Sequence, residues 1–262
     1  MNQKVFANGI NIAYRFDGPV DAPVVLLSNS LMSNLSMWDP QIAVLEKSYR
    51  VLRYDTRGHG ATDDPPGPYS IKLLAEDAIA LLDGLGIDKV HFAGLSMGGM
   101  IAQYAGANFP ERVASLLLCD TASEMPTLEM WNDRISMAES QGIPAMVEPT
   151  LKRWFTAPYL ARQHPDLEKV AEMIRTTSPI GYVGCASAVR DMSQTSLLKN
   201  IKAPTIIIVG EDDPACTVAQ SRVLEEQIVG STLVILPEAA HLANIEQIDA
   251  FNQAMTTFLN AQ

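Results

Sequence analysis

The sequence predicts an α/β fold in which helices cover both faces of a doubly wound, mostly parallel β-sheet. Short apolar runs recur along the chain without polar alternation, which is typical of strands that are buried on both faces. Segments with helical periodicity separate most of these runs, as expected when strands and helices alternate. The strand pattern stops between residues 121 and 199, which indicates a helical insertion.

The chain opens with an expected β-hairpin. Residues 4–6 and 11–16 have the composition of strands, and Asn8-Gly9 between them is a favoured two-residue hairpin turn. We therefore expect an antiparallel edge on the otherwise parallel sheet.

Strands and helices then alternate. The expected core strands are residues 24–27, 49–54, 90–93, 113–119, 205–209 and 232–236. The expected helices are residues 38–46, 70–85, 97–108, 218–227 and 245–259. This arrangement assigns residues 1–120 and 200–262 to the α/β core.

Residues 121–199 form the expected insertion, in which methionines and prolines recur among helical segments. On an α/β scaffold, an insertion at this point lies over the strand ends where ligands bind, so we expect a lid. The alternative is a set of helices that only extends the core, because flexible methionines fill irregular gaps in both cases.

Composition excludes several classes of protein. The 262 residues are 47% hydrophobic and 19% charged, which is ordinary for a globular protein. The first residues lack the apolar block of a secretory signal and no segment is long enough to cross a bilayer, so we expect a cytoplasmic protein. The net charge of −11 disfavours nucleic acid and anionic membranes as partners. An anionic substrate would need a locally placed arginine or lysine. The oligomeric state stays open.

The three cysteines are Cys119, Cys185 and Cys216. They are widely separated and lack the paired spacing of a disulfide framework or a zinc site. We therefore expect buried or idle thiols and no metal site.

Ser96 is the expected nucleophile. It lies in Gly94-Leu95-Ser96-Met97-Gly98, after the strand at 90–93 and at the start of the helix at 97–108. A sharp strand-to-helix turn exposes such a serine, the glycines remove side chains that would clash, and the helix N-terminus favours developing negative charge. The Gly-x-Ser-x-Gly pattern alone is weak, and its position between a strand and a helix makes it specific.

A serine hydroxyl needs a base, and the chain has four histidines. His59 follows the second core strand, where it shapes a loop more readily than it catalyses. His91 lies inside a strand, and His164 precedes a proline in the insertion. His241 follows the last strand, at the same edge of the sheet as Ser96, and is the expected base.

The acid is expected after the strand at 205–209, in Gly210-Glu211-Asp212-Asp213-Pro214. Asp213 is the first choice and Asp212 the reserve, while a helix-capping carboxylate is the alternative role for Asp213. The order Ser96, Asp213, His241 is the nucleophile–acid–base order of α/β-hydrolases. Two backbone N–H groups, of Leu31 and Met97, are expected to form the oxyanion hole.

The chain resembles the 3-oxoadipate enol-lactonases of aromatic catabolism over nearly its whole length. The stretches that carry the resemblance are Leu27 to Leu31, Met37-Trp38-Asp39, Tyr54 to Gly60, Gly94 to Met100, Trp131 to Ile135, Arg153 to Thr156, Val189 to Met192 and His241 to Glu246. The core motifs are shared by many α/β-hydrolases, whereas the Ser28-Asn29-Ser30 loop and the motifs of the insertion are more specific.

The resemblance implies hydrolysis of 3-oxoadipate enol-lactone to 3-oxoadipate without a cofactor, by Ser96, Asp213 and His241. The substrate carboxylate implies a cation in the lid, for which Arg134 beside Trp131 is the first candidate. Arg190 and Arg153 are alternatives, and a solvated helix arginine is the other reading of Arg134.

Two positions depart from the family pattern. Met32 stands where a small glycine is expected, and Ala243 where a serine is usual. The sequence therefore does not determine the shape of the pocket entrance or the ring substituents of the natural lactone. A carboxylesterase acting on other small esters, or a non-hydrolytic lyase on the same fold, are the competing predictions.

Overall fold

The computed structural model describes residues 2–125 and 127–262, so residues 1 and 126 of the expected core and insertion lie outside the description. Its centre is an eight-stranded sheet with the order β1-β2-β4-β3-β5-β6-β7-β8. The strands are β1 (Gln3–Ala7), β2 (Ile10–Asp17), β3 (Val24–Ser28), β4 (Arg50–Tyr54), β5 (Val90–Leu95), β6 (Val113–Cys119), β7 (Thr205–Gly210) and β8 (Thr232–Leu236).

The pairing follows the sequence-based expectation. β1 pairs with β2 and β2 with β4 in antiparallel register, and the neighbours from β4 to β8 are parallel. Because parallel strands end at one edge, the residues that follow β5, β6, β7 and β8 gather there. The predicted α/β fold with a mostly parallel sheet is confirmed.

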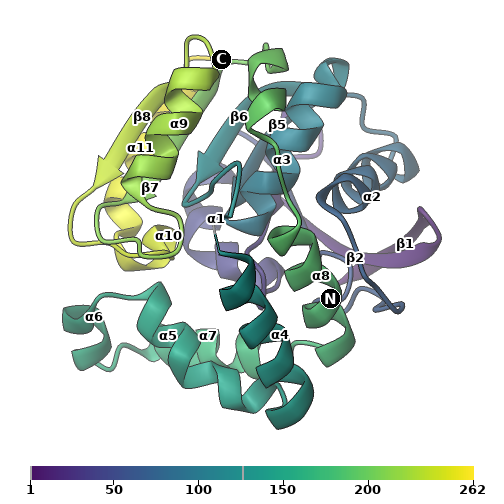
Figure 1. Ribbon diagram of the computed structural model, residues 1–262. Helices are drawn as coiled ribbons and strands as arrows, with labels where there is room; N and C mark the ends of the chain where they lie inside the picture. Colours follow the sequence, from purple (N-terminus) through teal and green to yellow (C-terminus); the bar gives the residue numbers. More distant parts are fainter. Residues whose placement is uncertain (1, 126) are drawn as a thin grey trace.

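Helices cover both faces of the sheet, as Figure 1 shows. α2 packs against α3, and α3 packs on β5 and β6, while α1 packs against α11 on the other side. The core helices are α1 (Asp39–Leu45), α2 (Ile71–Gly84), α3 (Met97–Asn108), α9 (Val218–Gln227), α10 (Ala243–Glu246) and α11 (Ile248–Leu259). Ser70 caps α2, because its side chain accepts a hydrogen bond from the Leu73 N–H.

The chain between β6 and β7 forms helices, which we call the insertion helices. They are α4 (Leu128–Gln141), α5 (Val147–Trp154), α6 (Ala157–Ala161), α7 (Pro165–Arg175) and α8 (Pro179–Arg190). In Figure 1 they gather at one end of the sheet, in teal and green. An isolated bridge between Glu124 and Ser193 joins the two ends of this segment.

The prediction of a single helix at residues 245–259 was wrong. It is divided into α10 and α11 at Gln247, whose φ of −123° and ψ of 57° leave the helical region. The Asn244 side chain donates to the Met37 carbonyl and to Gln41 on α1. This buried polar contact fixes the position of α10, and periodicity cannot reveal it.

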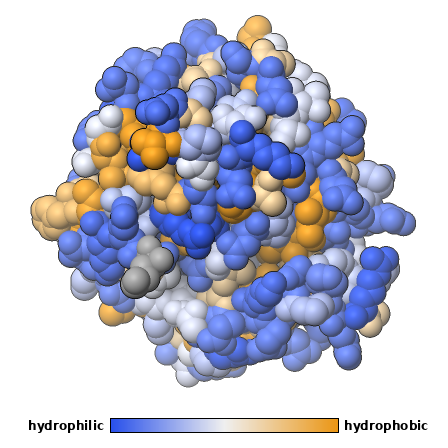
Figure 2. All heavy atoms as spheres, turned by 180° about the vertical axis from the view of Figure 1, so that it is seen from behind, coloured by the Kyte–Doolittle hydropathy of each residue, from blue (hydrophilic) through white to orange (hydrophobic). Residues whose placement is uncertain are grey.

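None of the helices in the described residues has both the length and the apolar character that a membrane crossing needs. On the rear face of the molecule, apolar side chains occur in separate groups among polar ones (Figure 2).

Candidate active site

Ser96 occupies a strained turn between β5 and α3. Its φ of 56° and ψ of −117° are rare for a residue with a side chain. The two flanking glycines make the turn possible, because an added Cβ would lie 2.1 Å from the Gly98 carbonyl oxygen at Gly94 and 2.1 Å from the Ser28 oxygen at Gly98. The sequence motif therefore has the strand-turn-helix context that a nucleophilic serine requires.

Hydrogen bonds fix this turn to the end of β6. The Ser96 N–H donates to the Cys119 carbonyl at 2.9 Å, and the Ser96 carbonyl accepts from the Thr121 hydroxyl at 2.7 Å. Strain of this kind persists only where the surroundings determine the backbone, and these bonds supply that restraint.

Asp213 and His241 form a buried pair. The Asp213 Oδ2 lies 2.8 Å from the His241 Nδ1. The Asp213 Oδ1 accepts from the N–H groups of Ala215 and Cys216, at 2.7 and 3.0 Å. A carboxylate at Nδ1 favours the tautomer in which Nε2 is free to take a proton. Asp212, the reserve, is exposed, and among the described side chains the hydrogen bond to His241 Nδ1 comes from Asp213 instead.

The Asp120 carboxyl lies beside this pair, at the end of β6. Its Oδ1 accepts the Gly210 N–H at 2.8 Å. Burial and then the negative charge of Asp213 raise the pKa of Asp120 well above its usual range. The protonated, neutral form of Asp120 is therefore favoured beside Asp213.

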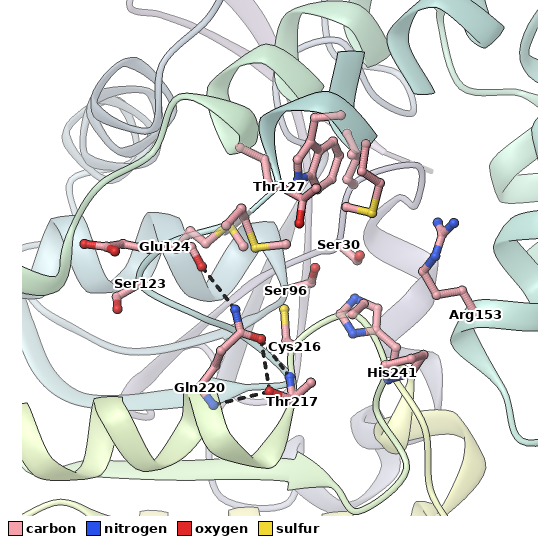
Figure 3. A pocket seen from close by; sticks show the side chains of 18 of the residues that line it. Ser30, Ser96, Ser123, Glu124, Thr127, Arg153, Cys216, Thr217, Gln220 and His241 are labelled. Carbon is pink, nitrogen blue, oxygen red and sulfur yellow. Dashed lines mark hydrogen bonds between the residues drawn. The ribbon is translucent and has the colours of Figure 1, made fainter. Parts of the chain in front are cut away.

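One cavity of about 520 Å³ brings most of the predicted site residues together, whereas Asp213 and Met97 do not line it. Its wall includes Ser96, His241, Leu31, Trp131 and Arg134. No hydrogen bond joins Ser96 to His241 in the described part of the chain, and such bonds commonly tighten only when substrate binds. Figure 3 shows Ser96 near the middle of the labelled side chains, with His241 to one side.

The loop after β3 is held in an unusual conformation by a neutral histidine. Met32 has a φ of 65°, which explains why a glycine is expected there. The Met32 N–H donates to the His59 Nε2 at 3.0 Å, and the His59 Nδ1 lies 3.2 Å from the Arg57 carbonyl oxygen. Burial lowers the pKa of His59 to about 4, so it accepts this bond at neutral pH. The expected loop-shaping role of His59 thus has a defined geometry.

This loop presents Leu31 to the cavity. Among the described residues, the Leu31 N–H donates to no other group. Met97 is the first residue of α3, where N–H groups have no acceptor within the helix. Leu31 lines the cavity whereas Met97 does not, so the oxyanion hole formed by these two N–H groups stays a prediction.

Two arginines line the cavity without an acidic partner among the described side chains. The Arg134 guanidinium lies 4.4 Å from the centre of the Trp131 ring, which holds it by a cation–π contact. Burial, and then the positive charge of Arg134, lower the pKa of Arg153. Arg190, an alternative from the sequence, does not line the cavity and is paired with Asp191.

Sequence reasoning did not assign roles to Trp154 and Glu246. The Trp154 ring lies 6.3 Å from the His241 ring. Glu246 accepts the Ala240 N–H at 2.9 Å and the Thr156 N–H at 3.0 Å, so it joins the His241 loop to the insertion. Both residues occur in the stretches that resemble the enol-lactonases, and that resemblance was the available signal.

Comparison with known proteins adds to these structural observations. Residues 23–157 match the family model of the alpha/beta hydrolase fold. The curated protein 3-oxoadipate enol-lactonase 2 of Acinetobacter baylyi is 39% identical, over 95% of this chain and 93% of its own length. The chain belongs to the 3-oxoadipate enol-lactonase family. The predicted family and the predicted class of enzyme, a carboxylic ester hydrolase, are confirmed.

Solved structures agree with membership of the enol-lactonase family. The crystal structure of the enol-lactonase from Burkholderia xenovorans has a TM-score of 0.96 at 39% identity, and the match covers 98% of this chain and 100% of that one. A thermophilic esterase from Thermogutta terrifontis, solved with malate bound, has a TM-score of 0.92 at 27% identity, covering 100% and 98% of the two chains.

Proposed function

We propose that this protein hydrolyses 3-oxoadipate enol-lactone to 3-oxoadipate in the β-ketoadipate pathway of aromatic catabolism. The observation that carries the proposal is a single cavity whose wall holds Ser96, His241 and the arginines Arg134 and Arg153. Ser96 and His241 suit attack on an ester bond, and Arg134 and Arg153 suit the binding of an anionic substrate. The enol-lactonase relatives support the choice of this lactone.

In the acylation step, His241 accepts the proton of Ser96 while the serine oxygen attacks the lactone carbonyl. The oxyanion accepts hydrogen bonds from the Leu31 and Met97 N–H groups. The carbonyl–oxygen bond of the ring breaks, and the enol oxygen leaves with a proton from His241. Because the substrate is a ring, the leaving group stays attached to the acyl chain.

In the second step, the enol tautomerises to a ketone and water releases the acyl group. His241 takes a proton from the water and returns one to Ser96. Asp213 keeps the imidazole in the required tautomer and stabilises its protonated form, as the 2.8 Å contact with Nδ1 allows.

The arginines act on the part of the substrate that does not react. A guanidinium binds a carboxylate through two parallel hydrogen bonds, and Arg134 is oriented for this by Trp131. Arg153 adds a second positive charge to the same cavity. We further propose that residues 121–199 act as a lid, since Trp131, Arg134 and Arg153 all come from the insertion helices.

A carboxylesterase acting on other small esters or lactones is the second candidate. The esterase from Thermogutta terrifontis, which shares the fold over the whole chain, favours this alternative. A non-hydrolytic lyase is also compatible with the fold alone. The ratio of kcat/KM for the enol-lactone to kcat/KM for a neutral aryl ester separates the first two functions.

The experiment that tests the proposal is product analysis after adding the enol-lactone to wild type and to Ser96→Ala. Wild type should form 3-oxoadipate, and the variant should fall close to the uncatalysed rate. A Thr121→Ser variant, which keeps the hydroxyl behind Ser96, serves as the matched control for folding around the turn. Equal hydrolysis by wild type and Ser96→Ala would refute the assignment.

A further inference from the structure

Cys216 lies beside the proposed acid and base. One carboxylate oxygen of Asp213, the Cys216 sulfur and one ring nitrogen of His241 all lie within 4.8 Å of one another, and the three residues are buried. Cys216 and His241 both line the cavity, so a small ion in the cavity can reach them. Figure 3 shows the sulfur of Cys216 directly below Ser96. The spacing of the cysteines did not reveal this group, because its members are one cysteine, an aspartate three residues before it and a distant histidine.

We propose that Asp213, Cys216 and His241 bind a thiophilic divalent cation such as Zn²⁺, and that this cation reversibly inhibits the enzyme. Thiolate, imidazole and carboxylate are the three side-chain ligands that Zn²⁺ prefers in proteins. The ion is an inhibitor and not a cofactor, because it occupies the groups that the proposed reaction needs.

The present geometry is close to that of a zinc site. Tetrahedral Zn²⁺ has bonds of about 2.3 Å to sulfur and about 2.0 to 2.2 Å to nitrogen and oxygen, which places neighbouring ligand atoms roughly 3.3 to 3.6 Å apart. The three observed ligand atoms lie within 4.8 Å of one another, so this arrangement requires side-chain shifts and the opening of the 2.8 Å hydrogen bond between Asp213 and His241. The Cys216 N–H donates to the Asp213 Oδ1 at 3.0 Å, so the backbone already holds the thiol beside the acid.

Metal binding replaces the proton of the thiol. The cation forms a bond to sulfur and the proton passes to solvent. When the ion takes a ring nitrogen of His241 and an oxygen of Asp213, the hydrogen bond between them opens and His241 loses its role as base. The inhibitory effect therefore rests on the proposed function, whereas the binding does not.

Binding is tested first with Co²⁺, a spectroscopic substitute for Zn²⁺, on the intact protein. Wild type should show the near-ultraviolet absorption of a cobalt–thiolate bond, Zn²⁺ should abolish it, and Cys216→Ser should lack it. A His164→Gln variant, which alters an exposed histidine beside Asp166, should retain the signal. Absence of the cobalt–thiolate signal in wild type, or its persistence in Cys216→Ser, would overturn the proposal.

Inhibition is tested by titrating Zn²⁺ against hydrolysis of a neutral aryl ester, with each variant compared to its own uninhibited rate. Zn²⁺ should inhibit wild type, EDTA should restore the activity, and Cys216→Ser should need at least about 10-fold more Zn²⁺. The same inhibitory concentration in both proteins would contradict a cysteine ligand. If the enol-lactone is not the substrate, the cobalt signal is unaffected, so the two proposals fail separately.

Discussion

At the scale of single residues, hydrogen bonds distinguish the two buried carboxyl groups near His241: Asp213 contacts the imidazole, whereas Asp120 accepts the Gly210 N–H. Asp120 and Asp213 both lie at the carboxyl edge of the sheet and are both almost inaccessible to solvent. Burial, followed by the negative charge of Asp213, raises the pKa of Asp120. Asp213 accepts hydrogen bonds from two backbone N–H groups in addition to the contact with His241, and these bonds hold its carboxyl group in place.

The first prediction concerns Asp213. Asp213→Asn should lower kcat for the enol-lactone by about 10⁴-fold, because the amide favours the wrong tautomer of His241. The neighbouring exposed Asp212→Asn is the matched control and should stay near the wild-type rate. Steady-state kinetics of the two variants provide the measurement. Similar losses in both would remove Asp213 from the proposed triad.

The second prediction concerns Arg134. Arg134→Ala should lower kcat/KM for the anionic lactone by about 10- to 100-fold, since a charge-assisted hydrogen bond contributes about 1.5 to 3 kcal/mol. The rate with a neutral aryl ester should change much less. Arg190→Ala, whose side chain is paired with Asp191 outside the cavity, is the control. A parallel loss for both substrates would indicate a structural role for Arg134.

At the scale of elements, the loop after β3 depends on a histidine that must remain neutral. His59 is fully buried and accepts the Met32 N–H, which stabilises the left-handed conformation next to Leu31. Protonation of His59 would replace this acceptor with a donor. The position of the proposed oxyanion donor is therefore coupled to pH.

The third prediction follows from this coupling. The folded pKa of His59 is about 4 and its ordinary value is 6.5, so the unfolded chain binds more protons between these values. The stability contribution of His59 is complete above pH 6.5 and is lost as the pH falls toward 4. At pH 5 the loss should be about 2 kcal/mol. His59→Gln, which can still accept the Met32 N–H, should lack this part of the acid sensitivity.

Urea unfolding of wild type and His59→Gln at pH 7 and pH 5 measures the acid sensitivity that is assigned to His59. Buried carboxyls with raised pKa values, such as Asp55 and Asp77, act in the opposite direction, but they are common to both proteins. The informative quantity is therefore the difference between the two acid-induced changes. An equal loss of unfolding free energy in both proteins would show that His59 is not the responsible group.

The strands and the proposed triad could be predicted from the sequence because they depend on short, continuous stretches of residues. Ser96 follows β5 directly, Asp213 and His241 lie in the loops after β7 and β8, and parallel strands bring such positions to one edge. Other features depend on packing between distant segments. The contact of Glu246 with Thr156 requires the insertion to meet the His241 loop. The break at Gln247 depends likewise on side chains of α1.

The arginines of the cavity could be predicted from the sequence only in part. The resemblance to the enol-lactonases identified Arg134 and offered Arg153 and Arg190 as alternatives, but helical periodicity could not rank them. The structure places Arg134 and Arg153 on the cavity wall and Arg190 against Asp191. Which face of a short helix meets a cavity depends on how α4, α5 and α8 pack together.

At the scale of the whole molecule, a negatively charged protein binds an anion in the proposed reaction. The net charge of −11 repels the substrate at a distance, while Arg134 and Arg153 attract it inside the cavity. Ionic strength screens both effects, with a Debye length of about 10 Å at 0.1 M salt. The balance between them can be measured.

The fourth prediction concerns the salt dependence of kcat/KM. In wild type, kcat/KM for the anionic lactone should fall as salt increases, because the nearby arginines dominate. In a variant with both Arg134→Ala and Arg153→Ala, kcat/KM should rise with salt, since only repulsion by the net charge is left. Lys152→Ala, an exposed neighbour paired with Glu148, is the control and should follow wild type. The same slope in wild type and the double variant would contradict local capture.

The central claim is that Ser96 opens a lactone ring by forming an acyl-enzyme. Mass spectrometry of the acid-quenched enzyme during turnover tests it most directly. Because the leaving group stays attached, the peptide that contains Ser96 should gain the full mass of the lactone, with no atoms lost. The adduct should be absent from Ser96→Ala. An adduct on another residue, or undiminished turnover by Ser96→Ala, would contradict the claim.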